Sequence, residues 1–284
     1  MSIVWPASIL LLWVPGALLS RILGLKRRPD RITRIALELS LGLAFWPILL
    51  LWTSTLGLRW SPSGARLLFI ALLGATAVIA VVARRREPPV SLSHSLSGGR
   101  AIQGALFILV ALLAVSTRAF QIEGVVLPPW VDSVHHEMVV RLIVEGGAVP
   151  VSYAPFIPGS AAAAYHWGFH APVAWLAWLL GRTDPFEIAG LLLHYGQVLN
   201  ALSVFALYTA GRELFASRRA GLLSALLGTL VLWFPAYYTA WGRYPQLAGL
   251  LLLPSFASET WGAVPLSLAV IGPFDDDALS LSGQ

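Results

Sequence analysis

The chain has 284 residues, of which 57% are hydrophobic and 12% are charged, and its net charge is +5. Soluble domains carry roughly twice that charged fraction, so the composition predicts a polytopic membrane protein. In such a protein the basic surplus is first a topology signal rather than a sign of nucleic-acid binding. The chain has no cysteine, which excludes disulfides and thiol catalysis.

Six apolar segments are long enough to cross a bilayer, which takes about 20 residues of helix. They cover residues 3–23, 35–56, 66–83, 101–119, 187–210 and 219–239. The first lacks a basic leader and a small-residue cleavage site, so we expect a retained helix rather than a signal peptide. Shorter apolar runs lie at 166–180 and from Leu247, the latter interrupted by "SFASET". The predicted fold is an all-α polytopic membrane helical bundle with about six or seven transmembrane helices.

The placement of Lys and Arg predicts the orientation, because cytoplasmic loops of membrane proteins are enriched in them. "RILGLKRRPDRITR" after the first segment holds six, and "RRREPP" after the third holds three. With both on the cytoplasmic side, the N-terminus and a long loop, 120–186, are external. If 166–180 crossed the membrane, the basic "GRELFASRR" would fall outside, so we expect a juxtamembrane or re-entrant helix there. Thirteen of the 19 Lys and Arg residues then lie on the cytoplasmic side.

The same pattern divides the chain into four parts. Residues 1–86 hold three leading transmembrane helices, and the polar stretch 87–100, "EPPVSLSHSLSGGR", is a cytoplasmic linker. Residues 101–254 form a membrane core that includes the external loop, and 255–284 form an irregular C-terminal end. The predicted location is the plasma membrane, which the chain crosses several times.

The external loop concentrates ionisable residues within "WVDSVHHEMVVRLIVEGG". Residues 134–145 are expected to form an amphipathic helix at the membrane surface. Glu137 and Arg141 are spaced to pair with each other on its polar face. Its apolar stripe consists of Val134, Met138 and Leu142.

Asp132 comes just before this helix, and two interpretations of it are compatible. It can be the N-cap of the helix, or a general base that deprotonates an acceptor hydroxyl or amine. His135 and His136 follow closely, so either imidazole can approach the Asp132 carboxylate, contact a phosphate or bind a divalent cation. Adjacent helical positions point in different directions, which argues against a metal shared by the two rings.

Two further external segments carry candidate ligand-binding side chains. "YHWGFHAP" supplies Tyr165, His166 and His170, which are typical of an aromatic belt at the membrane interface and would also suit sugar stacking. The spacing of its two His residues also suits a metal ion, although the belt is the favoured interpretation. "AWGRYPQ" supplies Arg243 and Tyr244, and the guanidinium can either reach lipid headgroups or bind a phosphate with two hydrogen bonds.

The order of these segments resembles the GT-C superfamily of integral membrane glycosyltransferases, which includes protein O-mannosyltransferases and the catalytic subunits of oligosaccharyltransferases. The likeness covers about residues 101–254 and rests on "WVDSVHHEMVVRLIVEGGAVP", "YHWGFHAPVAWLAWLLG" and "ALYTAGRELFASRRAGLLSALLGTLVLWFP". It implies that Asp132 is the catalytic base and that a polyprenyl-phosphate sugar is the donor on the outer face. The substrate-binding residues would then be His135, His136, Tyr165, His166, His170, Arg243 and Tyr244.

Three features depart from that family's pattern. Residues 3–83 add helices before the usual start, and "TAWGRYPQ" has no carboxylate. The missing carboxylate argues against a metal-dependent mechanism, so no cofactor is expected. Members usually continue with several more helices, so the chain is expected to be a truncated member.

Two other classes of function compete with a transferase. A transporter or flippase-like permease would carry ionisable residues near the middle of the bilayer, but the predicted spans hold few, chiefly Glu38 and His194. A non-catalytic membrane subunit is the third class. No phosphate-binding loop or dinucleotide fingerprint is present. The expected partners are the lipid-linked donor, membrane lipids and an unspecified acceptor, but no nucleic acid.

Overall fold

The computed structural model describes residues 3–25, 30–86, 98–159 and 166–263, and most of these are helical. The helices are α1 (Val4–Ile22), α2 (Arg31–Thr55), α3 (Pro62–Arg86), α4 (Gly98–Gln121), α5 (Val131–Gly146), α6 (His170–Leu180), α7 (Pro185–Leu214), α8 (Arg218–Leu226), α9 (Trp233–Ala236) and α10 (Tyr244–Ala263). A π-helical turn, η3 (Leu227–Val231), follows α8, and a 3₁₀ helix, η4 (Tyr237–Trp241), follows α9.

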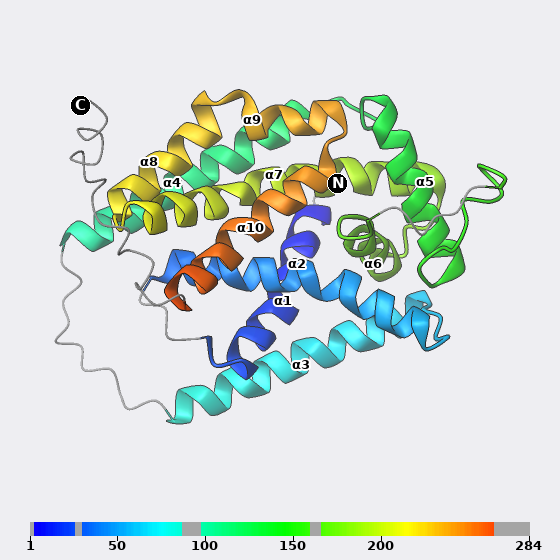
Figure 1. Ribbon diagram of the computed structural model, residues 1–284, viewed down its shortest axis with the longest axis horizontal. Helices are drawn as coiled ribbons and strands as arrows, with labels where there is room; N and C mark the ends of the chain where they lie inside the picture. Colours follow the sequence, from blue (N-terminus) through cyan, green and yellow to red (C-terminus); the bar gives the residue numbers. More distant parts are fainter. Residues whose placement is uncertain (1–2, 26–29, 87–97, 160–165, 264–284) are drawn as a thin grey trace, which may run out of the picture.

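Five of the described helices, α1, α2, α3, α4 and α7, are long and apolar enough to cross a membrane. A sixth apolar unit consists of Arg218–Val231 and Trp233–Trp241, which meet at an angle of 60°. The prediction of an all-α, multi-pass helical membrane bundle is therefore confirmed. In Figure 1, α4, α7 and α8 run side by side along the long axis, while α5 and α6 lie together at the right-hand end.

Polar contacts show which connections share an end of the bundle. Asp30, before α2, is 3.3 Å from the Nε of Arg212 and 3.8 Å from Arg218, so the α1–α2 connection meets the α7–α8 turn. We call this the basic end. At the other end, the backbone N–H of Trp60 donates to the carbonyl of Gly147, joining the α2–α3 connection to the end of α5. We call that the Asp132 end.

The prediction that 166–180 does not cross the membrane agrees with this arrangement. The two basic segments lie at one end, as expected if α6 leaves the sidedness of the chain unchanged. Its 11 residues make a helix roughly 16 Å long, about half the thickness of the hydrocarbon core. Every side chain from His170 to Trp178 is buried, so the helix is enclosed by its neighbours instead of lying on the surface.

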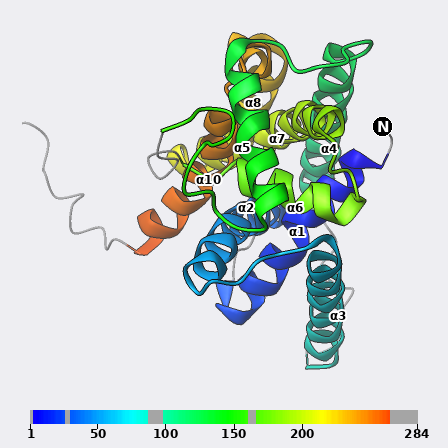
Figure 2. The same ribbon diagram turned by 90° about the vertical axis from the view of Figure 1, so that its right-hand side faces the viewer.

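Aromatic packing surrounds α6 on the side of α2 and α3. The ring of Trp175 lies 4.6 Å from that of Trp46 and 4.7 Å from that of Trp60. A helix that is apolar all round has to be buried on every side. The same hydrophobic cluster includes residues of α1, α2, α5, α6, α7 and α10, so the leading helices share one core with the rest. Figure 2 shows α5 crossing in front of α6 at this end.

Helix α7 is the central element of the bundle, and 89% of the residues in its 18-residue apolar stretch are buried. Its start is fixed by the sequence "DPFE". The carboxylate of Asp184 accepts from the backbone N–H of Phe186, Pro185 occupies the first turn, and the Glu187 side chain accepts from the Asp184 N–H. This capping box satisfies N–H groups that have no partner within the helix.

Helices α1 and α2 cross in close contact because each presents a glycine to the other. A Cβ built on Gly42 would overlap the carbonyl oxygen of Leu12, and one built on Gly16 would overlap that of Glu38. The carboxylate of Glu38 accepts a 2.8 Å hydrogen bond from the indole of Trp13. Small residues that allow backbones to approach are typical of packed membrane helices.

The predicted span at 219–239 corresponds to the bent unit Arg218–Trp241, and its bend was not predicted from the sequence. Leu232 and Phe234 have extended backbones, with ψ of 138° and 140°, between α8–η3 and α9–η4. Pro235 follows Phe234, and a proline disfavours helical geometry at the residue before it and removes a helix hydrogen bond. The second half of the unit ends beside the start of α5, where the ring of Trp241 lies 6.4 Å from that of Trp130.

The C-terminal part differs from the expected irregular end. Helix α10 continues to Ala263 without a break at "SFASET", so residues 255–263 are helical. Residues 264–284 lie outside the described ranges. So does most of the expected linker, 87–97, whereas α4 already begins at Gly98.

We expect Gly42→Ala to lower the free energy of unfolding by about 1–3 kcal/mol, because the new methyl group must displace the α1 backbone. Gly74→Ala on α3 is the matched control, since a Cβ there meets nothing within 4 Å. It should be neutral or stabilising by up to about 1 kcal/mol. Thermal unfolding in detergent compares the two variants, and equal transitions would contradict the close α1–α2 contact.

Candidate functional site

Asp132 occupies the first turn of α5, at the Asp132 end of the bundle. The helix begins at Val131 and its N-cap position is Trp130, which has φ 74° and makes no capping side-chain hydrogen bond. The interpretation of Asp132 as the N-cap is therefore wrong. The carboxylate still lies near the positive end of the helix dipole, and 41% of the side chain is exposed.

Arg243 meets Asp132 from a distant part of the chain. A terminal guanidinium nitrogen of Arg243 lies 3.5 Å from Oδ2 of Asp132, and 46% of the arginine side chain is exposed. This contact places both groups on one surface at the same end of the bundle, whereas the predicted outer cavity shared by the two residues and a donor phosphate stays a prediction. Both charges remain accessible to a ligand, since neither is enclosed.

The turn that carries Arg243 packs directly on α5. Gly242 has φ 62°, a left-handed conformation that glycine adopts without strain. A Cβ at this position would lie 3.0 Å from the hydroxyl oxygen of Ser133 and 3.1 Å from Cβ of Asp132. The backbone N–H of Arg243 donates to the carbonyl of Tyr238, which closes the turn. The close approach therefore depends on the missing side chain at Gly242.

Two buried imidazole rings lie beneath this surface. Nε2 of His136 is 3.0 Å from the carbonyl oxygen of Gly242, and its Nδ1 is 2.9 Å from Nε2 of His170. Nδ1 of His170 lies 3.2 Å from the backbone carbonyl of His166. Both side chains are enclosed. A substrate-binding role for His136 and His170 stays a prediction, and their burial points to a different role.

Tyr244 forms the wall of this buried cluster. Its ring stacks on Phe169, with centroids 5.2 Å apart and an interplanar angle of 11°, and lies 5.8 Å from His136. A Cβ on Gly196 of α7 would overlap the Tyr244 ring, so α7 is flat where the ring packs. Tyr244 is therefore buried, and its predicted contact with substrate is untested.

The remaining predicted histidines lie nearer the surface. His135 is partly buried, with its ring 5.4 Å from that of Tyr153. His166 is exposed and precedes α6, so the helical pairing with His170 that would suit a metal is not formed. Tyr165 lies outside the described residues. Within the described part of the chain, no three His, Asp or Glu side chains converge on a metal site.

The expected pairing along α5 is wrong. Arg141 pairs with Glu145, at 2.7 Å, and its guanidinium lies over the ring of Phe156. Oε1 of Glu137 is buried and has no hydrogen-bond partner in the described ranges, and burial raises the pKa of this carboxyl. Val134 of the expected apolar stripe is exposed. The face that packs inwards consists of Ser133, His136, Met138, Val139, Val140 and Ile143.

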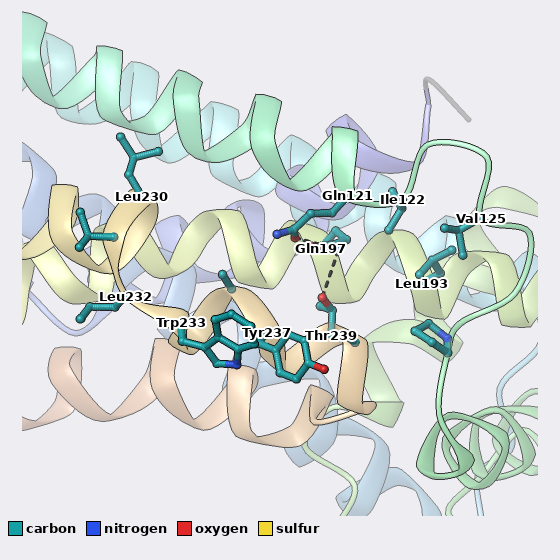
Figure 3. A pocket seen from close by; sticks show the side chains of 14 residues that line it. Gln121, Ile122, Val125, Leu193, Gln197, Leu230, Leu232, Trp233, Tyr237 and Thr239 are labelled. Carbon is teal, nitrogen blue, oxygen red and sulfur yellow. Dashed lines mark hydrogen bonds between the residues drawn. The ribbon is translucent and has the colours of Figure 1, made fainter.

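A cavity of about 440 Å³ opens beside the bent span, between α4, α7 and the segment 230–240. Figure 3 shows Gln197 of α7 between Gln121 and Thr239, and its amide nitrogen lies 3.1 Å from the Thr239 hydroxyl. Most of the other lining groups are apolar. Pro129 and Ala240 are among its lining residues, and each is three residues from Asp132 or Arg243 in the sequence. The cavity was not predicted from the sequence, because the bend within 219–239 that borders it was not foreseen.

Arg118 is a second feature that the sequence analysis missed. It is buried in the last turn of α4, where its Nε donates to Asn200 and a terminal nitrogen donates to the carbonyl of Thr229 in η3. The contact satisfies a carbonyl of the π-helical turn, and the cation lies at the negative end of the α4 dipole. The sequence did contain a signal for this buried role, because Arg118 is a single arginine in the last turn of an otherwise apolar segment.

Residues 9–266 match the model of a family described as a family of unknown function, DUF6541, and the chain belongs to that family. No curated protein matches the chain. No solved structure matches it either.

We expect acid to weaken the fold through His136. Burial lowers the pKa of this ring to about 4, against 6.5 in its ordinary state. The unfolded chain then binds the proton more tightly, so stability present above pH 6.5 is lost as the pH falls towards 4, by about 3 kcal/mol. His136→Gln should lose less stability between pH 7 and pH 4.5 in denaturant unfolding. Equal losses in the two proteins would contradict this assignment.

Proposed function

We propose that this protein is a membrane glycosyltransferase that moves a sugar from a polyprenyl-phosphate donor to an acceptor at the outer face of the plasma membrane. The observation that carries the proposal is the contact of Asp132 with Arg243, two half-exposed opposite charges brought together from distant segments. An exposed ion pair contributes at most about 1 kcal/mol to stability. The pair is therefore better explained by what it does with a ligand than by what it adds to the fold.

Each member of the pair has a defined step in the proposed reaction. The acceptor hydroxyl or amine gives its proton to the Asp132 carboxylate as its oxygen or nitrogen bonds to the anomeric carbon of the sugar. The bond between that carbon and the phosphate oxygen breaks, and the phosphate takes the electron pair. Arg243 stabilises the negative charge on this leaving group.

The contact between the two residues also suggests how the site is prepared. Arg243 pairs with Asp132 at 3.5 Å. A donor phosphate, which carries one negative charge as a diester, competes with Asp132 for the guanidinium and can bind it through two parallel hydrogen bonds in place of the single 3.5 Å contact. The carboxylate of Asp132 is then released and can accept a proton. Binding of the donor would in this way activate the base.

The cavity beside the bent span supports the choice of a lipid-linked donor. It lies between membrane-crossing helices, and Pro129 and Ala240, which line it, belong to the segments that carry Asp132 and Arg243. Leu230, Val231 and Trp233 line it and are largely exposed. An isoprenoid chain entering from the bilayer could occupy this space with its phosphate directed towards Arg243.

A permease is the main competing class, and the buried charges of the spans bear on it. Arg118 is enclosed by Asn200 and the Thr229 carbonyl, and Glu38 is held by the indole of Trp13. Both charges join neighbouring helices and neither lines a described cavity. These contacts favour a structural role for both charges over a role in a transport pathway, and they therefore favour a transferase over a permease.

Asp132→Asn should reduce sugar transfer by about 10²–10⁴-fold, because the amide cannot accept the acceptor's proton. Arg243→Gln should reduce it by about 10²-fold or more, through loss of charge stabilisation at the phosphate. Transfer from a panel of fluorescent polyprenyl-phosphate sugars in proteoliposomes measures both.

Arg141→Gln is the matched control, since this arginine pairs with Glu145 on the surface of the same helix. An exposed pair of this kind is worth little, so the rate should stay within about threefold of the original. If Asp132→Asn also stays within that range in a protein that is otherwise active, Asp132 is not the base.

The orientation that the proposal requires can be measured in the cysteine-free background. Val151→Cys, at the Asp132 end, should react with an impermeant maleimide on intact cells. Phe215→Cys, at the basic end, should react only after permeabilisation. Both original side chains are exposed, so access is not limited by packing. The reverse labelling pattern would place Asp132 in the cytoplasm and remove the outer-face reaction.

A further inference from the structure

Helix α5 holds the turn at 242–243 through two side chains one helical turn apart. The Asp132 carboxylate meets the Arg243 guanidinium at 3.5 Å, and four residues later Nε2 of His136 meets the Gly242 carbonyl at 3.0 Å. Residues four apart lie on the same face of a helix. The first contact is half-exposed, whereas the second is buried.

The buried contact has a defined direction. A carbonyl oxygen only accepts, so the hydrogen lies on Nε2 of His136, and the Nδ1 of a neutral ring is then an acceptor. Nε2 of His170 must donate to that Nδ1, across 2.9 Å. His170 Nδ1 is left facing the carbonyl of His166 at 3.2 Å, the longest of the three contacts. Two neutral rings thus supply the hydrogens for the two shorter contacts. His170 donates to His136, and His136 donates to the Gly242 carbonyl.

Burial is consistent with this neutral pair. It lowers the pKa of both His136 and His170 well below the ordinary value, and the nearby His166 acts in the same direction. The hydrogen bond to the Gly242 carbonyl and, to a smaller extent, the charge of Asp132 raise the pKa of His136, although each contributes less than burial. The neutral state therefore predominates at neutral pH.

We propose that His136 is a positioning residue that sets the place of Arg243 opposite Asp132, and that His170 acts through it by fixing its tautomer. The inference rests on the proposed function in one respect only, which is that the positioned Arg243 guanidinium binds the donor phosphate. It assigns the buried rings a role that needs no contact with substrate.

The residues on either side of Arg243 explain why the hydrogen bond from His136 to Gly242 can fix the position of the Arg243 side chain. Gly242 is held by His136 and packs against Ser133. Tyr244 is buried against Phe169. Arg243 is thus the exposed residue between two fixed neighbours, so the direction of its side chain follows from the buried contacts. The exposed ion pair is screened by solvent and salt and would not hold the turn by itself.

A distance measurement tests the proposal without any assay of activity. Spin labels on Val134→Cys and Gln246→Cys, both exposed positions in a cysteine-free chain, report the separation of α5 from the start of α10. We expect a narrow distribution in the labelled parent and a broader one after His136→Leu. His136→Gln should restore the narrow distribution, because its amide nitrogen can reach the place of Nε2.

His194→Gln is the control, since this buried ring pairs with Trp5 away from the turn. It should leave the distribution narrow. An unchanged distribution in folded His136→Leu protein would overturn the proposal. So would a failure of His136→Gln to restore it, because the hydrogen bond to Gly242 would then not be what matters.

Nitrogen NMR of ¹⁵N-histidine-labelled parent protein gives a second test that does not depend on any His136 variant folding. His136 should be neutral at pH 7 with its hydrogen on Nε2, and a resonance pattern showing the hydrogen on Nδ1 would overturn the proposal. If the spin-label distances and the NMR tautomer are as expected but even the unmodified protein transfers no sugar, the result counts against the proposed function and leaves the positioning role of His136 intact.

Discussion

The buried hydrogen bond from His136 to the Gly242 carbonyl joins residues 106 positions apart and links α5 to the start of α10. A buried carbonyl left without a donor would cost about 1–3 kcal/mol, so the two elements cannot slide past each other freely. Helix α5 is placed in turn by α6, whose tryptophans fill the space beside α2 and α3. The relative positions of Asp132 and Arg243 follow from this junction.

Buried polar contacts of the same kind join the other helices of the bundle. A bilayer offers no water to exposed backbone groups, so every break in a helix needs a partner within the protein. Arg118 meets that need at η3, and the cluster around Asp30 closes the basic end. Helices α1 and α2 pack closely where Gly42 lies against the backbone of α1. The proposed functional surface lies at the Asp132 end, where Asp132 and Arg243 are left partly exposed.

The sequence predicted features that depend on local composition. Hydropathy located the spans because each needs its own run of apolar residues, and the basic segments predicted that α6 does not cross. The burial of His136 was beyond local reasoning, because its partner Gly242 lies far along the chain. The bend at Pro235 was missed because proline is ordinary in membrane helices. Glu137 was assigned to Arg141 by spacing, whereas tertiary packing gave Arg141 a different partner.

An experimental structure in lipid nanodiscs with a polyprenyl phosphate bound tests the account most directly. The account predicts the phosphate within hydrogen-bonding distance of the Arg243 guanidinium, the lipid chain in the cavity beside the bent span, and the Asp132 carboxylate released from its ion pair. A phosphate bound elsewhere, with Asp132 and Arg243 still paired, would contradict it.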